Sequence, residues 1–532
     1  MSFTSLGFLC FLALTACIYY LFPKKNQWAI LLVASYIFYF LAGRWYLPFI
    51  IFTTLSSYIC SLLLEKYTNT EKKYIEENKQ TMDKEARKLY KARAKKKRFY
   101  ILVLFLVLNF GVLGVLKYTG FALTNFISLI KIFNSDFTLK IPSLILPLGI
   151  SFYTFQTMGY LIDVYREKTE VERNIFKLAL FVSFFPQLVQ GPISRHSDLA
   201  DELLAEHRAK WDCIAPGVLR IAWGFFKKLV IADTLMIAIS TILGTPEKYE
   251  GMYVLYLILA YSAEIYADFT GGIDIAIGVG ELLGIKITEN FNHPFASKST
   301  AEYWKRWHIT MGSWFTDYVF YPVSICKPMQ KLSKKCRAKL GTNVGKRIPV
   351  YLATILTWFL TGLWHGASWN FIVWGLLNCA VILISQELSP LYSKFHARFP
   401  KLTSGRGWEI FAQMRTFVLM GIIRILDCYR NVPMTFKMFS TVFYKFSSWK
   451  NIFNGELDRL GLSLVNYMVV AIAIFAVYIV SRNTSIDDPL RNRIAKNPVV
   501  FAACLSLLII ATVIFGSYGI GFDASQFIYS QY

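Results

Sequence analysis

The sequence predicts an all-α, polytopic membrane protein with about 11–13 membrane helices, some of them re-entrant. Three observations lead to this fold class. Only 17% of the 532 residues are charged, whereas soluble domains average about 25%. Apolar runs such as 101–116, 349–363 and 499–515 are long enough, or nearly long enough, to cross a bilayer core as helices. Lysine and arginine are concentrated in short segments between such runs, where they set the orientation of the chain.

Thirteen apolar segments are candidate membrane spans. The first is expected to remain as a helix and not to be cleaved as a signal peptide, because its basic residues, Lys24 and Lys25, follow it instead of preceding it. The candidates are residues 5–22, 27–43, 46–64, 99–117, 141–163, 174–190, 214–244, 251–284, 349–365, 369–386, 408–426, 464–481 and 498–518.

The basic residues also predict which loops face the cytoplasm. The segment 65–98 holds thirteen Lys and Arg against six acidic residues, and the segment 327–347 holds eight with no acidic residue. Such an excess is typical of cytoplasmic loops. The basic segments 394–406 and 482–496 are assigned to the same side. Counting spans from these loops places the N-terminus and the C-terminus outside the cytoplasm.

The chain is expected to have three regions. Residues 1–98 form an N-terminal segment of three helices with a basic cytoplasmic loop. Residues 99–390 form a core that holds the candidate functional residues, and residues 391–532 form the C-terminal helices.

The middle of the chain departs from a simple series of crossings. An even number of crossings must lie between the first two basic loops, but five candidates lie there. One of them is therefore expected to be re-entrant, unless the segment 304–321 completes the path. Irregular backbone at membrane depth occurs where it is buried in protein or lines a wet cavity. This mismatch points to the functional centre of the protein.

The apolar segment 261–284 carries carboxylates where lipid would penalise them. Such groups face a partner or a cavity. We expect them first to pair with Lys227, Lys228 or Arg220, and the glycines between them to allow close helix packing. A direct part in chemistry is the alternative. The four carboxylates are Glu264, Asp268, Asp274 and Glu281.

Composition argues against several classes of function. The formal net charge is +23, from 57 basic and 34 acidic residues. The loops between spans account for this excess, so no nucleic-acid partner is expected. None of the nine cysteines stands in a C-x-x-C pair, and no zinc spacing is present, so no metal site is expected. The sequence has no P-loop or G-x-G-x-x-G, which predicts no bound cofactor, and no G-x-S-x-G elbow for a serine nucleophile.

His365 is the first candidate catalytic residue. It follows an apolar run that starts at a basic loop near Pro349, so about 1.5 Å per residue places it roughly 24 Å along the helix, in the outer half of the membrane. A second apolar span starts at Trp369, so His365 should lie near a corner between two helices. An imidazole in a partly dry site is a natural general base for a hydroxyl. The alternative is a histidine in an interfacial aromatic belt.

His308 is the second candidate. At helical spacing it shares one face with Trp304, Trp307, Met311 and Trp314. The pattern predicts an amphipathic helix that lies in the interface or lines a cavity. The alternative is a core histidine on an aromatic stripe.

Five blocks of sequence together resemble the membrane-bound O-acyltransferase family. The chain looks closest to the bacterial branch that includes the membrane subunit of alginate O-acetylation, with the D-alanyl transfer membrane protein of teichoic acid synthesis as a sister. The blocks follow the family's order. They are LPLGISFYTFQTMGYLIDVYR (146–166), FFPQLVQGPISRHSDL (184–199), YADFTGGIDIAIGVGELLGIKITENFNHPF (266–295), STAEYWKRWHITMGSWFTDYVFYP (299–322) and LTGLWHGASWNFIVWGLLN (360–378).

The resemblance implies a ring of helices around a central tunnel that joins a cytoplasmic and an outer funnel. His365 matches the catalytic histidine of the family's W-H-G motif, and His308 matches a second functional position in its R-W-H motif. One stretch departs from the family. Where W-x-F-F-R-A is common, residues 421–431 read GIIRILDCYRN, which concerns contacts with a partner more than catalysis. The candidate residues of the tunnel wall are Trp364, Trp307, Trp304, Asp268 and Asn292.

The implied function is acyl transfer in a bacterial plasma membrane. A short acyl group, expected to be acetyl, would pass from a cytoplasmic thioester donor, either acyl-CoA or an acyl-carrier protein. It would reach a hydroxyl of an extracytoplasmic polysaccharide or an extracytoplasmic acyltransferase partner, as in alginate-type exopolysaccharide O-acetylation. D-alanyl transfer to teichoic acid is one alternative. A membrane transporter or flippase that uses the intramembrane carboxylates is the alternative from another class.

Overall fold

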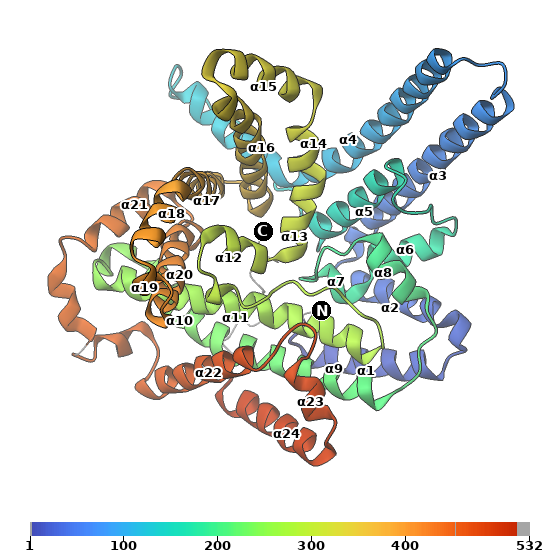
Figure 1. Ribbon diagram of the computed structural model, residues 1–532. Coiled ribbons are helices and arrows are strands. Elements are labelled where there is room, and N and C mark those ends of the chain that lie inside the picture. The colour runs from blue at the N-terminus through green and yellow to red at the C-terminus, as the bar shows by residue number, and fades with distance from the viewer. Residues whose placement is uncertain (1–2, 453, 519–532) are drawn as a thin grey trace. The chain divides into compact units, whose positions relative to one another are not determined.

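The computed structural model describes residues 3–452 and 454–518, and the chain divides into two compact units (Figure 1). The first unit consists mainly of Ser5–Lys210 with Gly280–Thr288. The second consists mainly of Trp211–Val279 and the chain from Glu289 onward. The regular elements of the described residues are helices, which confirms the predicted all-α class.

The first unit contains a long helical hairpin. The basic segment 65–98 continues two membrane helices, α3 and α4, beyond their apolar parts. Arg98 is buried at the base of this hairpin, 3.0 Å from Glu71 and 3.0 Å from Glu167. The helices of this unit are α1 (Leu6–Leu21), α2 (Gln27–Ala42), α3 (Leu47–Glu77), α4 (Lys84–Lys131), α5 (Ile150–Tyr165), α6 (Ile175–Ser183), α7 (Phe185–Leu188) and α8 (His196–Leu204).

The second unit holds both candidate histidines. Its first part is α9 (Trp211–Phe226), the π-helical turn η3 (Lys227–Ala232), α10 (Asp233–Gly244) and α11 (Met252–Leu282). The last residues of α11, from Gly280, are assigned to the first unit. Its middle part is α12 (Thr300–Arg306), α13 (Ile309–Phe315), the π-helical turn η6 (Thr316–Phe320), α14 (Tyr321–Ser324), α15 (Lys327–Leu340), α16 (Thr342–His365) and α17 (Trp369–Glu387). Its last part is α18 (Ser389–Arg398), α19 (Pro400–Thr403), α20 (Arg406–Tyr429), α21 (Val432–Thr441), α22 (Leu464–Arg482), α23 (Leu490–Ala495) and α24 (Pro498–Phe515).

Seven helical spans in the described part of the chain are long and apolar enough to cross a membrane. They are Arg44–Glu77, Lys84–Lys131, Met252–Leu282, Thr342–His365, Trp369–Glu387, Leu464–Arg482 and Pro498–Phe515, with Leu6–Leu21 as a shorter apolar helix.

Two other candidate spans are interrupted. The span expected over 141–163 becomes helical only at Ile150, after Pro147. The span expected over 174–190 breaks at Phe184, ahead of Pro186. Proline lacks a backbone N–H and restricts the residue before it, which explains both interruptions.

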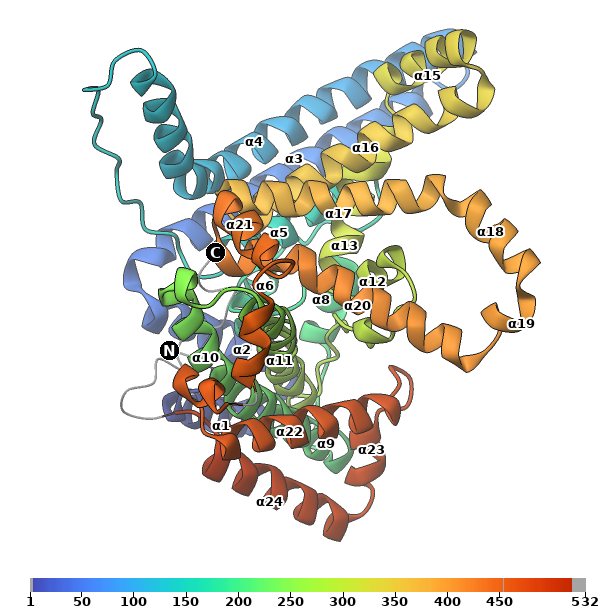
Figure 2. The same ribbon diagram turned by 90° about the vertical axis from the view of Figure 1, so that its left-hand side faces the viewer.

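Three basic segments of the second unit occupy corresponding ends of its helices. In Figure 2, α15 lies at the right-hand end of α16, and α18 and α19 lie at the right-hand ends of α17 and α20. The short helix α23 follows the right-hand end of α22 in the same view. This arrangement agrees with the assignment of 327–347, 394–406 and 482–496 to one side of the membrane.

Two of the four carboxylates of α11, Asp268 and Asp274, form the ion pairs that the sequence predicts. The structure describes no such pair for the buried Glu264, whose Oε2 has no hydrogen-bond partner among the described residues. Lys228 lies 2.6 Å from Asp268. Asp274 lies 2.6 Å from Lys227 and 2.9 Å from Arg220. A charge removed from water is tolerated when it is paired and hydrogen-bonded. The first expectation for Asp268 and Asp274 is therefore confirmed.

Glycines bring α9 and α11 into backbone contact, as the sequence also predicts. A Cβ atom added at Gly271 would lie 2.9 Å from the carbonyl oxygen of Gly224. A Cβ atom added at Gly278 would lie 2.9 Å from the carbonyl oxygen of Gly217. Small residues of this kind allow close packing between helices in a membrane. The close approach lets Arg220 and Lys227 reach across to α11.

Replacement of Gly271 by leucine should destabilise the second unit. The new side chain would collide with backbone atoms of Gly224 and Lys228, and overpacking typically costs about 1–3 kcal/mol. The thermal unfolding midpoint of the detergent-solubilised protein should fall. Gly114→Leu is the matched control, because a Cβ atom at Gly114 of α4 meets nothing within 4 Å. Equal midpoints for the two variants would contradict the packing argument.

Candidate functional site

The corner between α16 and α17 holds His365. His365 is the last residue of α16, and α17 begins four residues later at Trp369, so the corner expected from the sequence is present. Gly366 follows in extended backbone, and a Cβ atom there would lie 2.2 Å from the ring of Phe371. A larger residue at the glycine of the W-H-G motif would therefore collide with the Phe371 ring. It lets the chain turn tightly and keeps Phe371 against the histidine.

His365 is buried among aromatic rings. Only 8% of the residue is exposed. Its ring centroid lies 5.0 Å from Trp364, 4.9 Å from Trp374 and 6.5 Å from Phe371. An imidazole in such surroundings is poorly solvated, so electrostatic interactions with a reacting group are strong there.

The chain breaks at His308 instead of continuing as one helix. α12 ends at Arg306 and α13 begins at Ile309, while His308 has a φ of 51° in the left-handed region. The single amphipathic helix expected through this residue is therefore wrong. The physical reason is a competing partner: the backbone N–H of Ile309 donates to the carbonyl oxygen of Asn290 at 2.9 Å. Left-handed backbone in a side-chain-bearing residue persists where its surroundings hold it firmly.

Asn290 fixes the protonation pattern of the His308 ring. Its Oδ1 accepts hydrogen bonds from the backbone N–H of Thr310 at 3.1 Å and from the Thr310 hydroxyl at 2.9 Å. The atom that lies 3.2 Å from Nδ1 of His308 is therefore an acceptor oxygen. In the neutral ring Nδ1 must carry the proton, and Nε2 keeps the lone pair. The His308 side chain is fully buried.

Trp364 brings the two histidines into one cluster. Its ring lies 5.8 Å from the ring of His308 and 5.0 Å from the ring of His365, centroid to centroid. The R-W-H and W-H-G motifs, far apart in the sequence, thus meet at one indole. The structure brings together three of the predicted site residues here.

Trp304 and Trp307 complete the aromatic surroundings. Trp304 lies 5.5 Å from Trp374, and its Nε1 donates to Oδ1 of Asn378 at 3.1 Å. Trp307 stacks on Tyr303 at 5.6 Å, while Phe269 contacts Trp307 at 6.1 Å and His308 at 4.9 Å. Trp304 thus joins the cluster through Trp374, and Trp307 joins it through Phe269.

The remaining two predicted residues lie elsewhere. Asp268 is committed to the ion pair with Lys228, although its neighbour Phe269 contacts His308. Asn292 donates its backbone N–H to Arg306 and lines a separate cavity, described below. Neither residue has a described contact with the ring of His308 or of His365.

Comparisons with known proteins agree on one family. The sequence profile of MBOAT, the membrane-bound O-acyltransferase family, matches residues 170–429. The probable alginate O-acetylase AlgI of Azotobacter vinelandii is 33% identical over 379 residues, which is 71% of this chain and 69% of that protein. The chain belongs to the membrane-bound O-acyltransferase family. It is therefore a multi-pass membrane acyltransferase, and the transporter alternative is set aside.

Two other relatives of this acyltransferase carry different names. The peptidoglycan O-acetyltransferase of Helicobacter pylori is 32% identical over 408 residues, covering 72% of this chain and 68% of that protein. The teichoic acid D-alanyltransferase of Bacillus subtilis is 31% identical over 276 residues, covering 51% of this chain and 65% of that protein. All of these names describe the transfer of an acyl group.

Sequence reasoning missed two residues of the acyltransferase site. Asn290 stands in the quoted block 266–295, but nothing in its local pattern shows that it contacts His308. Arg424 is 4% exposed, and its guanidinium carbon lies 4.3 Å from the centroid of Trp307 while it donates to the hydroxyl of Tyr303. A cation over an indole face is attracted to it. The sequence feature that could have identified Arg424 is the presence of an arginine inside an apolar helix, which often marks a functional position.

Replacement of Asn290 by alanine should weaken both the fold and the activity. The change leaves the backbone N–H of Thr310 buried without its acceptor, which costs about 1–3 kcal/mol, and releases the His308 tautomer. Thr310→Val is the matched control, since it removes one hydroxyl donor but leaves the contact between Asn290 and His308. Thermal unfolding and acyl transfer should be measured together. Activity equal to that of Thr310→Val would show that the Asn290 contact does not matter for His308.

Proposed function

We propose that the protein transfers an acetyl group from a cytoplasmic thioester to a hydroxyl on the outer side of a bacterial plasma membrane. The observation that carries this proposal is the meeting of His308 and His365 on Trp364. A buried cluster with two imidazoles and no candidate serine elbow suits direct attack by the acceptor hydroxyl, because that route needs the fewest protein groups.

His365 acts as the general base in this proposal. Its neutral ring takes the proton of the acceptor hydroxyl while the oxygen attacks the thioester carbonyl carbon. The tetrahedral intermediate then collapses, the C–S bond breaks, and the leaving sulfur receives the proton from the imidazolium. The new C–O bond is the ester of the product. The surrounding rings of Trp364, Phe371 and Trp374 exclude water, which would otherwise hydrolyse the thioester.

His308 has a supporting role. Because its Nδ1–H is committed to Asn290, its Nε2 is the ring atom that can accept a hydrogen bond. It can thus orient a hydroxyl or a polar group of the donor without gaining a proton. Trp304 and Trp307 form part of the wall along which the substrates reach the two histidines.

The donor and the acceptor are inferred from chemistry and from the relatives. An anionic thioester, such as acyl-CoA or an acidic acyl-carrier protein, suits the basic loops 65–98 and 327–347 by charge. The relatives that match about 70% of the chain are named as O-acetylases of alginate or an O-acetyltransferase of peptidoglycan, which supports acetyl as the acyl group and a polysaccharide as the acceptor. An extracytoplasmic acyltransferase can relay the group. D-alanyl transfer is the second candidate, supported by relatives that match a smaller share of the chain.

Replacement of His365 by glutamine should lower acyl transfer by roughly 10²–10⁴-fold, because glutamine keeps a hydrogen bond but cannot act as the base. Activity of the wild type should also fall at acidic pH, because protonation of the His365 ring removes the base. The measurement is thiol release from a short acyl thioester by the reconstituted protein. His396→Gln is the control, because His396 is exposed on α18.

Three results would contradict this assignment. One is near wild-type transfer by His365→Gln. Another is an activity that stays flat between about pH 5 and 8. The third is loss of activity in His308→Ala together with retention in His365→Ala, which would reverse the two roles.

Both termini should lie outside the cytoplasm, and the segment 65–98 inside it. Single cysteines at Ser2, Lys91 and Ser530 can be labelled with an impermeant thiol reagent in intact cells, and Ser2 and Ser530 lie outside the described residues. We expect labelling at Ser2 and Ser530, with Lys91 protected until the cells are opened. Protection at Ser530 would overturn the orientation and the outer placement of His365.

A further inference from the structure

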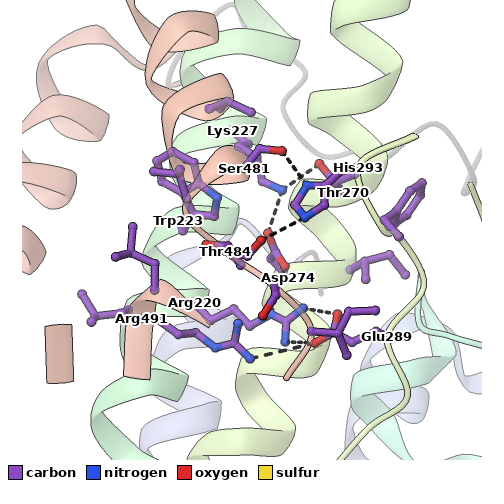
Figure 3. A pocket seen from close by; sticks show the side chains of 18 of the residues that line it. Arg220, Trp223, Lys227, Thr270, Asp274, Glu289, His293, Ser481, Thr484 and Arg491 are labelled. Carbon is purple, nitrogen blue, oxygen red and sulfur yellow. Dashed lines mark hydrogen bonds and ion pairs between the residues drawn. The ribbon is translucent and has the colours of Figure 1, made fainter. Parts of the chain in front are cut away.

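The second unit contains a cavity of about 310 Å³ that is separate from the histidine cluster (Figure 3). It lies among α9, α11, the segment 289–293 and the C-terminal helices α22, α23 and α24. Neither His308 nor His365 is among its described lining residues. Its occupant therefore need not be a reacting substrate.

One end of the cavity is polar and contains more basic than acidic groups. Three cationic residues, Arg220, Lys227 and Arg491, face two acidic ones, Asp274 and Glu289, which leaves one excess positive charge among the described lining residues. Burial lowers the pKa of His293 below its ordinary value, so this lining histidine adds no charge near pH 7. This end favours an anion.

The two arginines at the polar end differ in how closely they contact Glu289. Arg220 donates to both carboxylate oxygens of Glu289, at 2.7 and 2.6 Å, and to Asp274 at 2.9 Å, so its planar donors are used within the protein. Arg491 lies farther from Glu289, at 3.9 Å. Figure 3 shows Arg491 beside Arg220, with both guanidinium groups directed at Glu289. A ligand anion can approach the Arg491 guanidinium without displacing the bidentate pair.

The other wall of the cavity is apolar and belongs to lipid-facing helices. Val477 and Val480 of α22 and Leu507 and Leu508 of α24 line it. α24 buries none of its apolar span inside the described protein, and α22 buries only 11%. The protein leaves most of the apolar surface of these two helices uncovered, and in a membrane that surface would face lipid. An acyl chain could then reach the cavity from the bilayer without crossing water.

The polar and apolar parts of the cavity meet at the end of α22, where the head groups of a bilayer would lie. The polar residues Ser481, Thr484 and Arg491 come from the end of α22 and the basic segment that follows it, whereas the apolar wall comes from the helices themselves. An amphiphile with a negative head group and an acyl chain matches this order of polar and apolar groups. If a soluble thioester bound here, its acyl chain would lie against helices that face lipid.

We propose that this cavity binds an anionic phospholipid from the adjacent leaflet, with the phosphate at Arg491 and the start of one acyl chain between α22 and α24. The bound lipid links the C-terminal helices to α9 and α11 within the second unit. The proposal does not depend on acyl transfer, so it stands or falls separately from the proposed function.

The test uses the full-length protein, purified in detergent and stripped of lipid. Phosphatidylglycerol, phosphatidylcholine, glycerol 3-phosphate and acetyl-CoA are titrated separately, and binding is followed by native mass spectrometry and by the unfolding midpoint. We expect phosphatidylglycerol to bind and to raise the midpoint more than phosphatidylcholine does. Arg491→Gln should weaken phosphatidylglycerol binding on the order of tenfold or more, the effect of losing a charge-assisted contact. Arg493→Gln is the matched control, because Arg493 lies on the same helix outside the cavity lining.

A second pair of variants tests the apolar wall and covers the case in which Arg491→Gln does not fold. Cys504→Trp fills the cavity from α24 and should abolish selective binding of phosphatidylglycerol, whereas Val499→Trp, at an exposed position of the same helix, should not. Equal binding of the two phospholipids would overturn the proposal. Binding of glycerol 3-phosphate as tight as that of phosphatidylglycerol would identify a site for free phosphate compounds, and displacement of phosphatidylglycerol by acetyl-CoA would identify a donor pocket. Either result would also overturn it.

Discussion

The second unit depends on how the protein satisfies backbone polar groups where the helix breaks at His308. Buried N–H and C=O groups must find partners, and a break in a helix removes some of them. The extended segment 289–293 supplies replacements: Asn290 accepts from Ile309 and Thr310, and the backbone N–H of Asn292 donates to Arg306. The same contacts set the tautomer of His308. The need to pair these buried backbone groups thus explains both the backbone conformation of His308 and the protonation pattern of its ring.

Charge pairing is the second constraint, and it requires α9 and α11 to lie close together. Gly271 and Gly278 let α11 approach α9 closely enough for Arg220 and Lys227 to reach Asp274. Without that approach, carboxylates inside an apolar helix would lack partners and would be costly to bury. Arg220 also holds Glu289, at the start of the segment 289–293. The ionic network and the backbone of the histidine site are therefore connected through one short segment.

The aromatic side chains give the site its low polarity. The indole of Trp364 contacts the rings of both His308 and His365. Arg424 adds a buried cation on Trp307, next to His308 in the chain. Arg424 belongs to the stretch 421–431, which departs from the family pattern, and its side chain is buried. Such an enclosure favours proton transfer between bound groups over transfer to water.

The membrane class, the corner at His365 and the partners of Asp268 and Asp274 can be predicted from the sequence, because they follow from local composition, helical rise and charge. The blocks around His308 and His365 also mark the family. The other features of the site depend on how distant segments pack together. The helical period through Trp304 and Trp314 predicts an unbroken helix, but a hydrogen bond from a distant segment, at Asn290, breaks it at His308. The meeting of the two histidines on Trp364 and the cavity beside Arg491 likewise depend on contacts between segments far apart in the chain, and no local periodicity records such contacts.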